Sequence, residues 1–273
     1  MALGDLNRRD LLTTPETLHG QLASPSLCLI DTRPAEAFCQ GHIPGAIHFD
    51  LFGLSLTDTS EAPLRAFFSM MRHLFELRGV DGGKKVVFYE DHSGIRSARG
   101  MWFMHFFGHP DAGMLDGGLA AWKRCGYPVS TAAAPPVQTH YESTERRELL
   151  ATADDILSSL GSVEICIVDT RSEDEYMGRL VRAARGGAIP GAIHLQWTQN
   201  LDSGGSYKSP DELKAMYSEA GITPDKEVIV YCQGGYRSAH SYLALKRIGY
   251  PRVRNYLGSW KEWGDRQDLP IEV

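Results

Sequence analysis

The chain repeats itself once, and this repeat constrains its fold more than any other feature. The segment LIDTRPAEAF in the first half matches IVDTRSEDEY in the second, and GHIPGAIHFDL returns as GAIPGAIHLQW. Farther along, one constant offset aligns Arg96 with Arg237 and Trp122 with Trp263, together with the glycines and prolines between them. Two copies of one structural unit are therefore expected.

The two copies are separated by a stretch without a sustained apolar period. Residues 129–150 are rich in Ala, Pro, Ser, Thr and charge, as a linker over a surface would be. We therefore expect a first domain at residues 1–132, a linker at 133–149 and a second domain at 150–273.

Each copy alternates short apolar runs with segments of helical length. The runs are rich in β-branched residues and comprise residues 28–30, 86–89, 166–168 and 228–231. Such alternation is typical of parallel strands joined by crossover helices. The predicted class is α/β, with a mainly parallel sheet flanked by helices in each domain.

Cys232 follows one of these strands directly. A turn that contains Gly234 and Gly235 separates it from a helical pattern that starts at Ser238 and is closed by Gly249. Parallel α/β sheets place ligand chemistry at the carboxyl ends of strands, where helix N-termini favour anions. Cys232 is therefore predicted to be a nucleophile.

The surroundings of Cys232 favour its ionised form. Both glycines of the turn can adopt positive φ, so that successive N–H groups curl around one point, and Arg237 adds a permanent positive charge. Helix N-termini and nearby cations lower a cysteine's pKa, so most of Cys232 is expected to be thiolate at neutral pH.

These motifs resemble the rhodanese family, in particular its tandem-domain, thiosulfate-type bacterial members. The resemblance covers nearly the whole chain and rests on DTR and GHIPGAIH in the first copy, DTR and GAIPGAIH in the second, CQGGYRS, and the closing GSWKEWGDRQDLP. It implies two rhodanese-like domains of which only the second is catalytic. The repeat offset places Asp91 opposite Cys232, and a carboxylate cannot accept a sulfur atom.

The resemblance also implies a mechanism. The Cys232 thiolate takes the outer sulfur of thiosulfate as a persulfide, sulfite leaves, and cyanide or a thiol then collects the sulfur. Cys232 and Arg237 would be catalytic. The expected substrate-binding residues are Gln233, Gly234, Gly235, Tyr236, Ser238, Trp197 and Arg179.

One choice among arginines stays open at this point. The stretch RLVRAARGG also offers Arg182 and Arg185 beside Arg179, and the sequence does not decide which of the three contacts the donor.

Three other functions compete with this one. Related phosphatases separate Cys and Arg by five residues, whereas only the four residues from Gln233 to Tyr236 intervene here, which suits a terminal sulfur rather than a phosphoryl group. Donors of the 3-mercaptopyruvate type are commonly served by a Cys-Gly-Ser/Thr-Gly-Val-Thr loop, from which this chain departs. A non-enzymatic persulfide carrier for a partner protein needs the same cysteine and stays open.

Other features bound the remaining expectations. Asp31, Arg33, Asp169 and Arg171 recur in both copies and are expected to form structural ion pairs, and Cys28 and Cys166 are expected to be inert core residues. His240 lacks further ligands to make a zinc site with Cys232. No metal or organic cofactor is expected.

Composition and the N-terminus limit the partners and the compartment. The net charge is −6 without a long basic run, which argues against nucleic acid as a partner. The five cysteines form no CxxC pair, no apolar stretch is long enough to span a membrane, and MALGDLNRRDLL lacks the core of a signal peptide. A cytosolic monomer with small-molecule substrates is expected.

Overall fold

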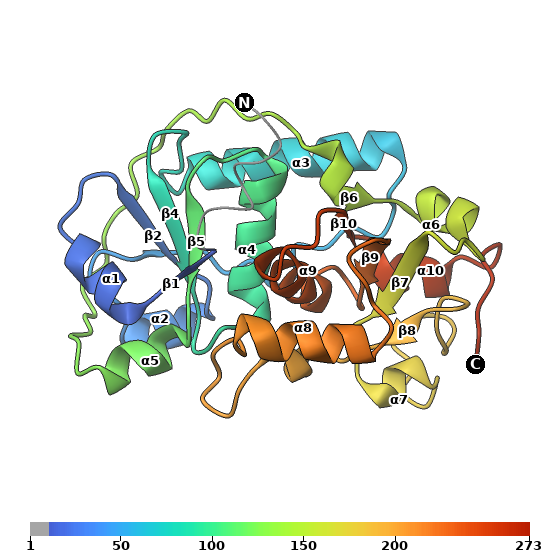
Figure 1. Cartoon of the computed structure of the whole chain (residues 1–273). Coiled ribbons are helices and arrows are strands. Elements are labelled where there is room, and N and C mark those ends of the chain that lie inside the picture. The colour runs from blue at the N-terminus through green and yellow to red at the C-terminus, as the bar shows by residue number, and fades with distance from the viewer. Residues whose placement is uncertain (1–10) are drawn as a thin grey trace. The chain divides into compact units, whose positions relative to one another are not determined.

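The computed structural model describes residues 11–273. Residues 1–10, which include most of the N-terminal stretch discussed for a signal peptide, lie outside the described residues. The chain forms two compact units, one centred on each copy of the repeat. Each unit is built around one parallel sheet (Figure 1).

The sheet of the first unit contains five parallel strands in the order β1-β5-β4-β2-β3. Their bounds are β1 (Leu12–Thr13), β5 (Ala112–Leu115), β4 (Lys85–Tyr89), β2 (Leu27–Asp31) and β3 (Ile47–His48). The central strands β2 and β4 are buried along almost their whole length, because helices cover both faces.

The sheet of the second unit repeats this order as β6-β10-β9-β7-β8, again with every pair parallel. Its strands are β6 (Leu150–Ala151), β10 (Val253–Tyr256), β9 (Glu227–Tyr231), β7 (Ile165–Asp169) and β8 (Ile193–His194). The predicted fold class, two α/β units with parallel sheets related by a repeat, is confirmed.

Helices connect the strands in both halves of the sequence. In the first half they are α1 (Pro15–Gln21), α2 (Ala35–Gln40), α3 (Glu61–Glu76), α4 (Ile95–Phe106) and α5 (Gly118–Arg124). In the second half they are α6 (Ala153–Ser159), α7 (Glu173–Tyr176), α8 (Pro210–Glu219), α9 (Arg237–Arg247) and α10 (Ser259–Asp265), with 3₁₀ turns η1 (Arg147–Leu149) and η2 (Trp197–Asn200).

The cores of the two units are built in the same way. In the first, Leu18 of α1, Phe38 of α2 and Trp122 of α5 pack on one face of the sheet. In the second, Ile156 of α6 and Trp263 of α10 pack on the corresponding face. In Figure 1, α4 lies on the opposite side of the first sheet from α1, α2 and α5.

The units are not continuous stretches of sequence. The first unit ends its main stretch at Arg146, inside the predicted linker, but it also includes Leu201–Tyr207 from the second half. The second unit includes Leu54–Phe67 from the first half. A single division of the chain at the linker does not account for these two exchanged segments. The segment Leu54–Phe67 contributes to the candidate site described below.

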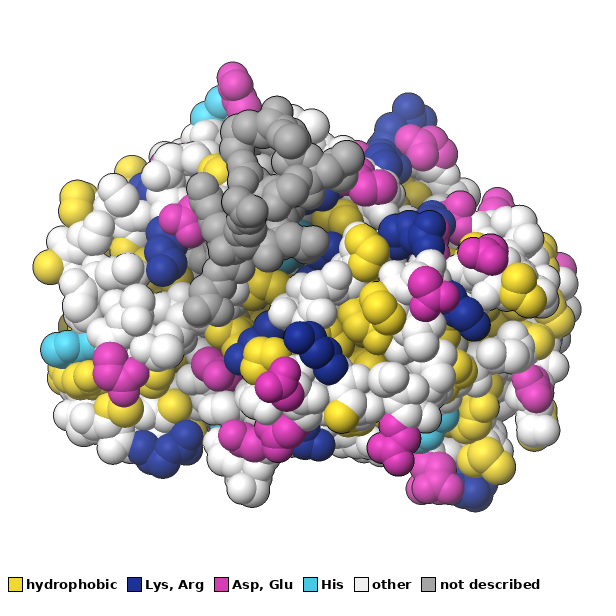
Figure 2. All heavy atoms as spheres, viewed as in Figure 1, with side chains coloured by type: hydrophobic (Ala, Val, Ile, Leu, Met, Phe, Trp, Pro, Cys, Tyr) yellow, Lys and Arg dark blue, Asp and Glu magenta, His cyan; other side chains and the backbone are white. Residues whose placement is uncertain are grey.

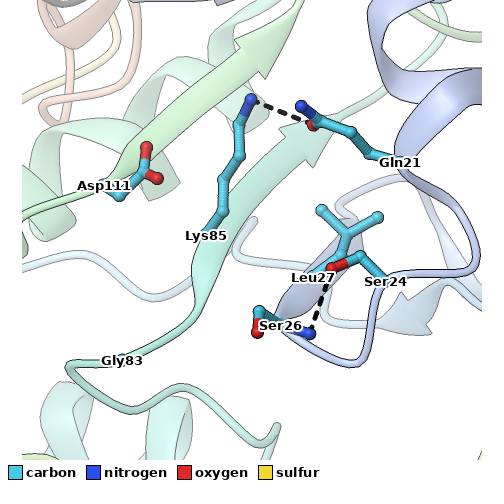
Figure 3. A pocket seen from close by; sticks show the side chains of 7 residues that line it. All are labelled: Gln21, Ser24, Ser26, Leu27, Gly83, Lys85 and Asp111. Atoms are coloured by element: carbon cyan, nitrogen blue, oxygen red, sulfur yellow. Dashed lines mark hydrogen bonds between the residues drawn. The ribbon is translucent and has the colours of Figure 1, made fainter.

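Polar hollows lie at the amino ends of the strands in both units. The first, of about 240 Å³, is drawn in Figure 3, where the Lys85 ammonium donates a hydrogen bond to Gln21. The second, of about 230 Å³, is lined in part by Ile165 and Lys226. Cys232 follows the opposite, carboxyl end of its strand.

Candidate active site

Cys232 is the first residue after β9, and α9 begins at Arg237. The loop between them is held by α10. The Cys232 carbonyl accepts a hydrogen bond from the Trp260 N–H at 2.9 Å, and the Gln233 carbonyl accepts one from the Lys261 N–H at 3.0 Å. The expected arrangement of strand end, tight turn and helix N-terminus is therefore present.

The Cys232 sulfur accepts hydrogen bonds from its own loop. The Gly235 N–H donates to Sγ at 3.1 Å, and the Ser238 hydroxyl lies 3.6 Å from it. Burial alone would raise the pKa of this thiol, but the charge of Arg237 and hydrogen bonds from Ser238 and Gly234 outweigh burial, and the pKa lies below its ordinary value. The site therefore favours a thiolate.

The sulfur is less accessible than a nucleophile in an open cleft. Cys232 is only 1% exposed. A donor that reaches Sγ must therefore be small, or the loop must move to admit it.

The two glycines of the turn serve different purposes. Gly235 has φ +84°, the left-handed region in which side chains are strained, as expected. Gly234 does not have positive φ, which corrects the expectation for this residue. A Cβ on Gly234 would lie 3.3 Å from the Ser55 Oγ, a tight contact that a larger residue could make only if the Ser55 side chain shifted.

Arg237 is bound to a carboxylate that the sequence analysis did not single out. Its Nη1 and Nη2 donate to the two oxygens of Glu175 at 2.5 and 2.9 Å. Glu175 is 2% exposed, and burial would raise its pKa, but the hydrogen bonds and charge of Arg237 together with Ser172 lower the pKa to about 2. Both ends of the guanidinium fork are thus occupied.

A local signal for Glu175 does exist in the sequence. Ser172 and Glu175 form a capping box at the start of α7, in which each side chain binds the other residue's backbone N–H. The spacing identifies a helix start, but it does not show that the same carboxylate reaches Arg237, which is distant in sequence.

The structure separates the three candidate arginines. Arg179 is paired with Asp174 at 2.7 Å and with Glu173 at 3.4 Å, and Arg185 donates to backbone carbonyls at the end of α10. Arg182 is 58% exposed at its side chain, and its Nε lies 3.5 Å from Glu175.

Arg182 contacts the loop through its backbone. Its carbonyl accepts a hydrogen bond from the Gln233 amide at 2.9 Å. The backbone of Arg182 thus contacts Gln233, while its cationic side chain lies beside the carboxylate that binds Arg237. Arg179, the predicted donor ligand, is instead held by its acidic neighbours Asp174 and Glu173 on α7.

The remaining predicted residues lie around this loop or its helix. Tyr236 is buried and immediately precedes α9. Trp197 is partly buried and packs edge to face on the His240 ring of α9 at 5.0 Å. His240 and Ser241 both contact the Asn200 amide, so this part of α9 is a buried polar network.

A segment from the first half of the sequence completes the surroundings of the loop. Ser55 lies against Gly234, and Thr59 binds Glu262 of α10 through both its N–H, at 2.7 Å, and its hydroxyl, at 2.8 Å. The Thr59 hydroxyl also accepts from the Ala153 N–H at 3.0 Å. Sequence reasoning missed this segment because it carries no motif and lies far from Cys232 along the chain.

The equivalent loop of the first unit requires a correction in alignment. Strand pairing matches Tyr89 with Asp31, and Tyr231 with Asp169, so the two tyrosines are equivalent. The residue opposite Cys232 is therefore Glu90 and not Asp91. Six residues lie between Tyr89 and Arg96, whereas five lie between Tyr231 and Arg237, so an alignment anchored on the two arginines shifts the strand end by one position.

Backbone contacts support this correction. The Glu90 carbonyl accepts from the N–H of Leu119 at 2.8 Å, just as the Cys232 carbonyl accepts from Trp260. The Glu90 carboxylate then accepts from the N–H groups of Arg96 at 2.7 Å and Ser97 at 3.1 Å. It occupies the place at the helix N-terminus that Sγ occupies in the second unit.

Asp91 has a structural partner instead. Its carboxylate lies 3.4 Å from the Arg33 guanidinium, which also binds Asp31 at 2.7 Å. The corresponding Arg171 binds Asp169 at 2.6 Å with both side chains buried. The structural ion pair predicted for both copies is thus present.

The other buried cysteines are poorly suited to nucleophilic chemistry. Burial raises the pKa of Cys28 to about 12 and that of Cys166 to about 11, despite small opposing effects from nearby lysines. Both thiols therefore stay protonated at neutral pH. This agrees with the prediction that they are core residues.

Charge and metal-binding side chains complete the description. Within residues 11–273, no group of three or more His, Cys, Asp and Glu side chains is placed to hold a metal ion. On the face drawn in Figure 2, basic and acidic side chains are interspersed. No helix in the same residues combines the length and apolar content needed to cross a bilayer.

Comparison with known proteins gives full-length matches. A family model described as a rhodanese-like domain matches residues 14–125 and 152–266. Thiosulfate sulfurtransferase of Azotobacter vinelandii is 34% identical over 99% of this chain and 100% of its own. Sulfur carrier protein TtuD of Thermus thermophilus is 37% identical over 85% of each chain.

A solved structure matches the fold. It is an anaerobic ergothioneine biosynthesis enzyme from Chlorobium limicola, with a TM-score of 0.87 and 23% identity. The match covers 100% of this chain and 72% of that one. At this identity the likeness concerns the fold.

Proposed function

The chain belongs to the rhodanese family as a protein with two rhodanese-like domains, and from this we propose that it is a thiosulfate sulfurtransferase in which Cys232 carries the sulfur as a persulfide. The observation that carries the proposal is the lowered pKa of the Cys232 thiol within a ring of N–H and hydroxyl donors. The relatives named thiosulfate sulfurtransferase support the donor.

The reaction proceeds in two displacements. The Cys232 thiolate attacks the outer sulfur of thiosulfate, the sulfur–sulfur bond of the donor breaks, and sulfite leaves with the electron pair. The protein now holds a persulfide anion. Cyanide or a thiolate then attacks the outer sulfur and restores the Cys232 thiolate, so no external oxidant or reductant is needed.

The loop donors stabilise the charge in both states. The N–H of Gly235 and the hydroxyl and N–H of Ser238 surround the thiolate, and the persulfide places its charge one sulfur farther out. Donors fixed before the reaction need not reorganise as the charge moves. The 1% exposure of Cys232 favours a small donor such as thiosulfate.

Arg237 and Arg182 take different parts in this proposal. Arg237, held by Glu175, acts as a fixed charge that favours the thiolate, and its occupied fork makes it a poor ligand for the donor. Arg182, whose side chain is largely exposed and whose backbone carbonyl binds Gln233, is the better placed arginine to attract and hold the sulfonate group of thiosulfate.

A carrier function is the second candidate. The relative named sulfur carrier protein TtuD favours it, because it covers most of this chain at similar identity. A carrier would form the same persulfide but release it slowly to small acceptors and rapidly to a partner protein. Turnover therefore separates the two functions better than persulfide formation does.

Intact-mass measurement after thiosulfate treatment tests the shared step. We expect the parent protein to gain one sulfur atom, which cyanide removes, and Cys232→Ser to gain none. Retention of the added sulfur in Cys232→Ser would assign the chemistry to another cysteine and overturn the proposal.

Steady-state assays then distinguish the candidates. Multiple turnovers with thiosulfate and cyanide support the enzyme, whereas a stable persulfide with negligible turnover supports the carrier. Parallel assays with 3-mercaptopyruvate identify the donor, and a higher kcat/KM for that compound would replace thiosulfate in the proposal.

A further inference from the structure

Ser259 has a backbone conformation that serine rarely adopts. Its φ is +53°, and within residues 11–273 it is the one non-glycine residue with positive φ. A left-handed φ is unfavourable for a residue with a Cβ, so glycine would adopt this backbone conformation with less strain. Ser259 is also fully buried at the start of α10.

The Ser259 hydroxyl binds the backbone of the reactive residue. It accepts a hydrogen bond from the Cys232 N–H at 3.1 Å and donates one to the Tyr256 carbonyl at 2.7 Å. Its Oγ lies 4.0 Å from the Cys232 Sγ. The hydroxyl thus ties the first residue of the loop to the end of β10.

The first unit shows that the fold itself does not require this serine. The residue before Leu119, equivalent to Ser259, is Gly118, with φ +57°. A Cβ on Gly118 would collide with the carbonyl of Glu90. The same backbone conformation is therefore adopted by Gly118 in the unit that has no nucleophile at the strand end. In the unit that has Cys232 there, it is adopted by Ser259.

We propose that Ser259 is a positioning residue for sulfur transfer, whose hydroxyl fixes the backbone of Cys232 and so keeps Sγ in register with the loop donors. Because the Trp260 N–H already holds the Cys232 carbonyl, the hydroxyl fixes the other side of the same residue. With both sides held, the sulfur projects in one direction toward the Gly235 N–H.

This inference rests on the proposed sulfur transfer, but it makes a separate claim about the thiol. Loss of the hydroxyl frees the Cys232 N–H, so Sγ should lose part of its hydrogen bonding. Reaction of Cys232 with iodoacetamide at different pH values reports the titration of the thiol without any sulfur transfer. A failure of the sulfur-transfer proposal therefore leaves this measurement valid.

The test compares Ser259→Ala with Ser259→Gly. Alanine keeps the Cβ and the unfavourable φ but removes the hydroxyl, whereas glycine removes both. Positioning predicts that both variants lose kcat for thiosulfate by about tenfold to a hundredfold, with the titration of the Cys232 thiol displaced to higher pH in both. It also predicts that Ser259→Gly melts at a higher temperature than Ser259→Ala, because glycine tolerates the φ.

A matched control removes a similar hydroxyl elsewhere in the second unit. Ser159 is buried and donates to the carbonyl three residues earlier, as Ser259 does, at 2.9 Å from Ile156. Ser159→Ala should therefore change stability without changing kcat or the thiol titration. Full activity and an unchanged thiol titration in Ser259→Gly would overturn the proposal, because only the backbone conformation would then matter.

Discussion

The two loops that follow the central strands use the same cradle for different anions. In the second unit, Sγ of Cys232 receives the Gly235 N–H and the Ser238 hydroxyl. In the first, a carboxylate oxygen of Glu90 receives the N–H groups of Arg96 and Ser97. In both units the helix N-terminus provides a positive potential, and an anionic side chain from the loop itself binds there.

The difference between the loops explains why one copy can be reactive and the other cannot. The longer Glu90 side chain fills the first cradle permanently, and a carboxylate forms no persulfide. Burial raises the pKa of Glu90 despite its hydrogen bonds to Ser97 and Arg96. The second cradle holds the Cys232 thiolate, a smaller and more polarizable anion that can bond to a further sulfur atom.

The largest expected effect comes from removing the second anion. Cys232→Ser should lower kcat for thiosulfate by more than about a thousandfold, because a serine hydroxyl is a poor nucleophile without an adjacent base. Steady-state assay with cyanide measures this loss. The matched change in the first loop, Glu90→Gln, keeps an acceptor for the Arg96 N–H and should leave kcat unchanged. A large loss of kcat in Glu90→Gln would break the distinction between the loops.

The next effect concerns the arginines that follow each loop. Arg237→Met removes the charge that lowers the pKa of Cys232 and deprives the buried Glu175 of its bidentate partner. We expect kcat/KM at pH 7 to fall by about tenfold to a hundredfold and to recover partly at higher pH, with a stability loss of about 3 kcal/mol. Rate profiles against pH and urea unfolding measure the two effects.

Arg96→Met is the matched control for this change. Arg96 follows the first loop and its Nε lies 3.3 Å from Asp50. Its removal should leave the pH profile of the rate unchanged. A profile that stays unchanged in Arg237→Met as well would show that Arg237 does not set the ionisation of Cys232.

Acid should affect the two glutamates in opposite directions. The pKa of Glu175 falls from 4.5 to about 2 on folding, so its stabilising contribution is present above pH 4.5 and is lost as the pH falls toward 2. The loss should be about 3 kcal/mol. The pKa of Glu90 is raised, so its ionised form destabilises the fold, and this cost disappears as the pH falls below the ordinary glutamate pKa.

Unfolding at several pH values measures this opposition. Glu175→Gln should be less stable than the parent at pH 7, and the gap should close toward pH 2. The difference between Glu90→Gln and the parent should instead favour the variant more at pH 7 than at pH 4. Parallel curves for a variant and its parent would contradict the assigned shift for that residue.

Much of this architecture could be predicted from the sequence because it is local or repeated. The alternation of apolar runs and helical segments predicted both sheets. The apolar run of β9, followed by a turn and the helical pattern of α9, predicted that Cys232 lies at a helix N-terminus. The Asp31 and Asp169 ion pairs were predicted because both copies carry them.

What the sequence did not predict depends on contacts between distant residues. The capping box already accounts for Glu175 in the sequence, so no further sequence pattern indicates its ion pair with Arg237. One extra residue between Tyr89 and Arg96 concealed that Glu90 is opposite Cys232, because the alignment was anchored on the two arginines. Ser259 looked like part of a family motif, and only its φ and its hydrogen bond to Cys232 single it out.

The two exchanged segments extend the comparison and give the smallest expected effect. In the first unit, the Ser93 N–H of the loop donates to the Gly205 carbonyl at 2.9 Å. In the second, the segment that carries Ser55 and Thr59 reaches Gly234 and Glu262. Each loop is thus steadied by residues from the other half of the sequence.

Thr59→Val tests whether this support matters in the second unit. Valine has the shape of threonine but leaves the Ala153 N–H without its acceptor and Glu262 without one donor. We expect unfolding to become easier by about 1–3 kcal/mol and kcat to fall only a few-fold, because Ser55 still covers Gly234 but is held less firmly. Thr57→Val, at an exposed position of the same segment, should change neither quantity. Equal stability of the Thr59 and Thr57 variants would mean that the bond to Glu262 contributes nothing, and that α10 alone holds the Cys232 loop through Trp260.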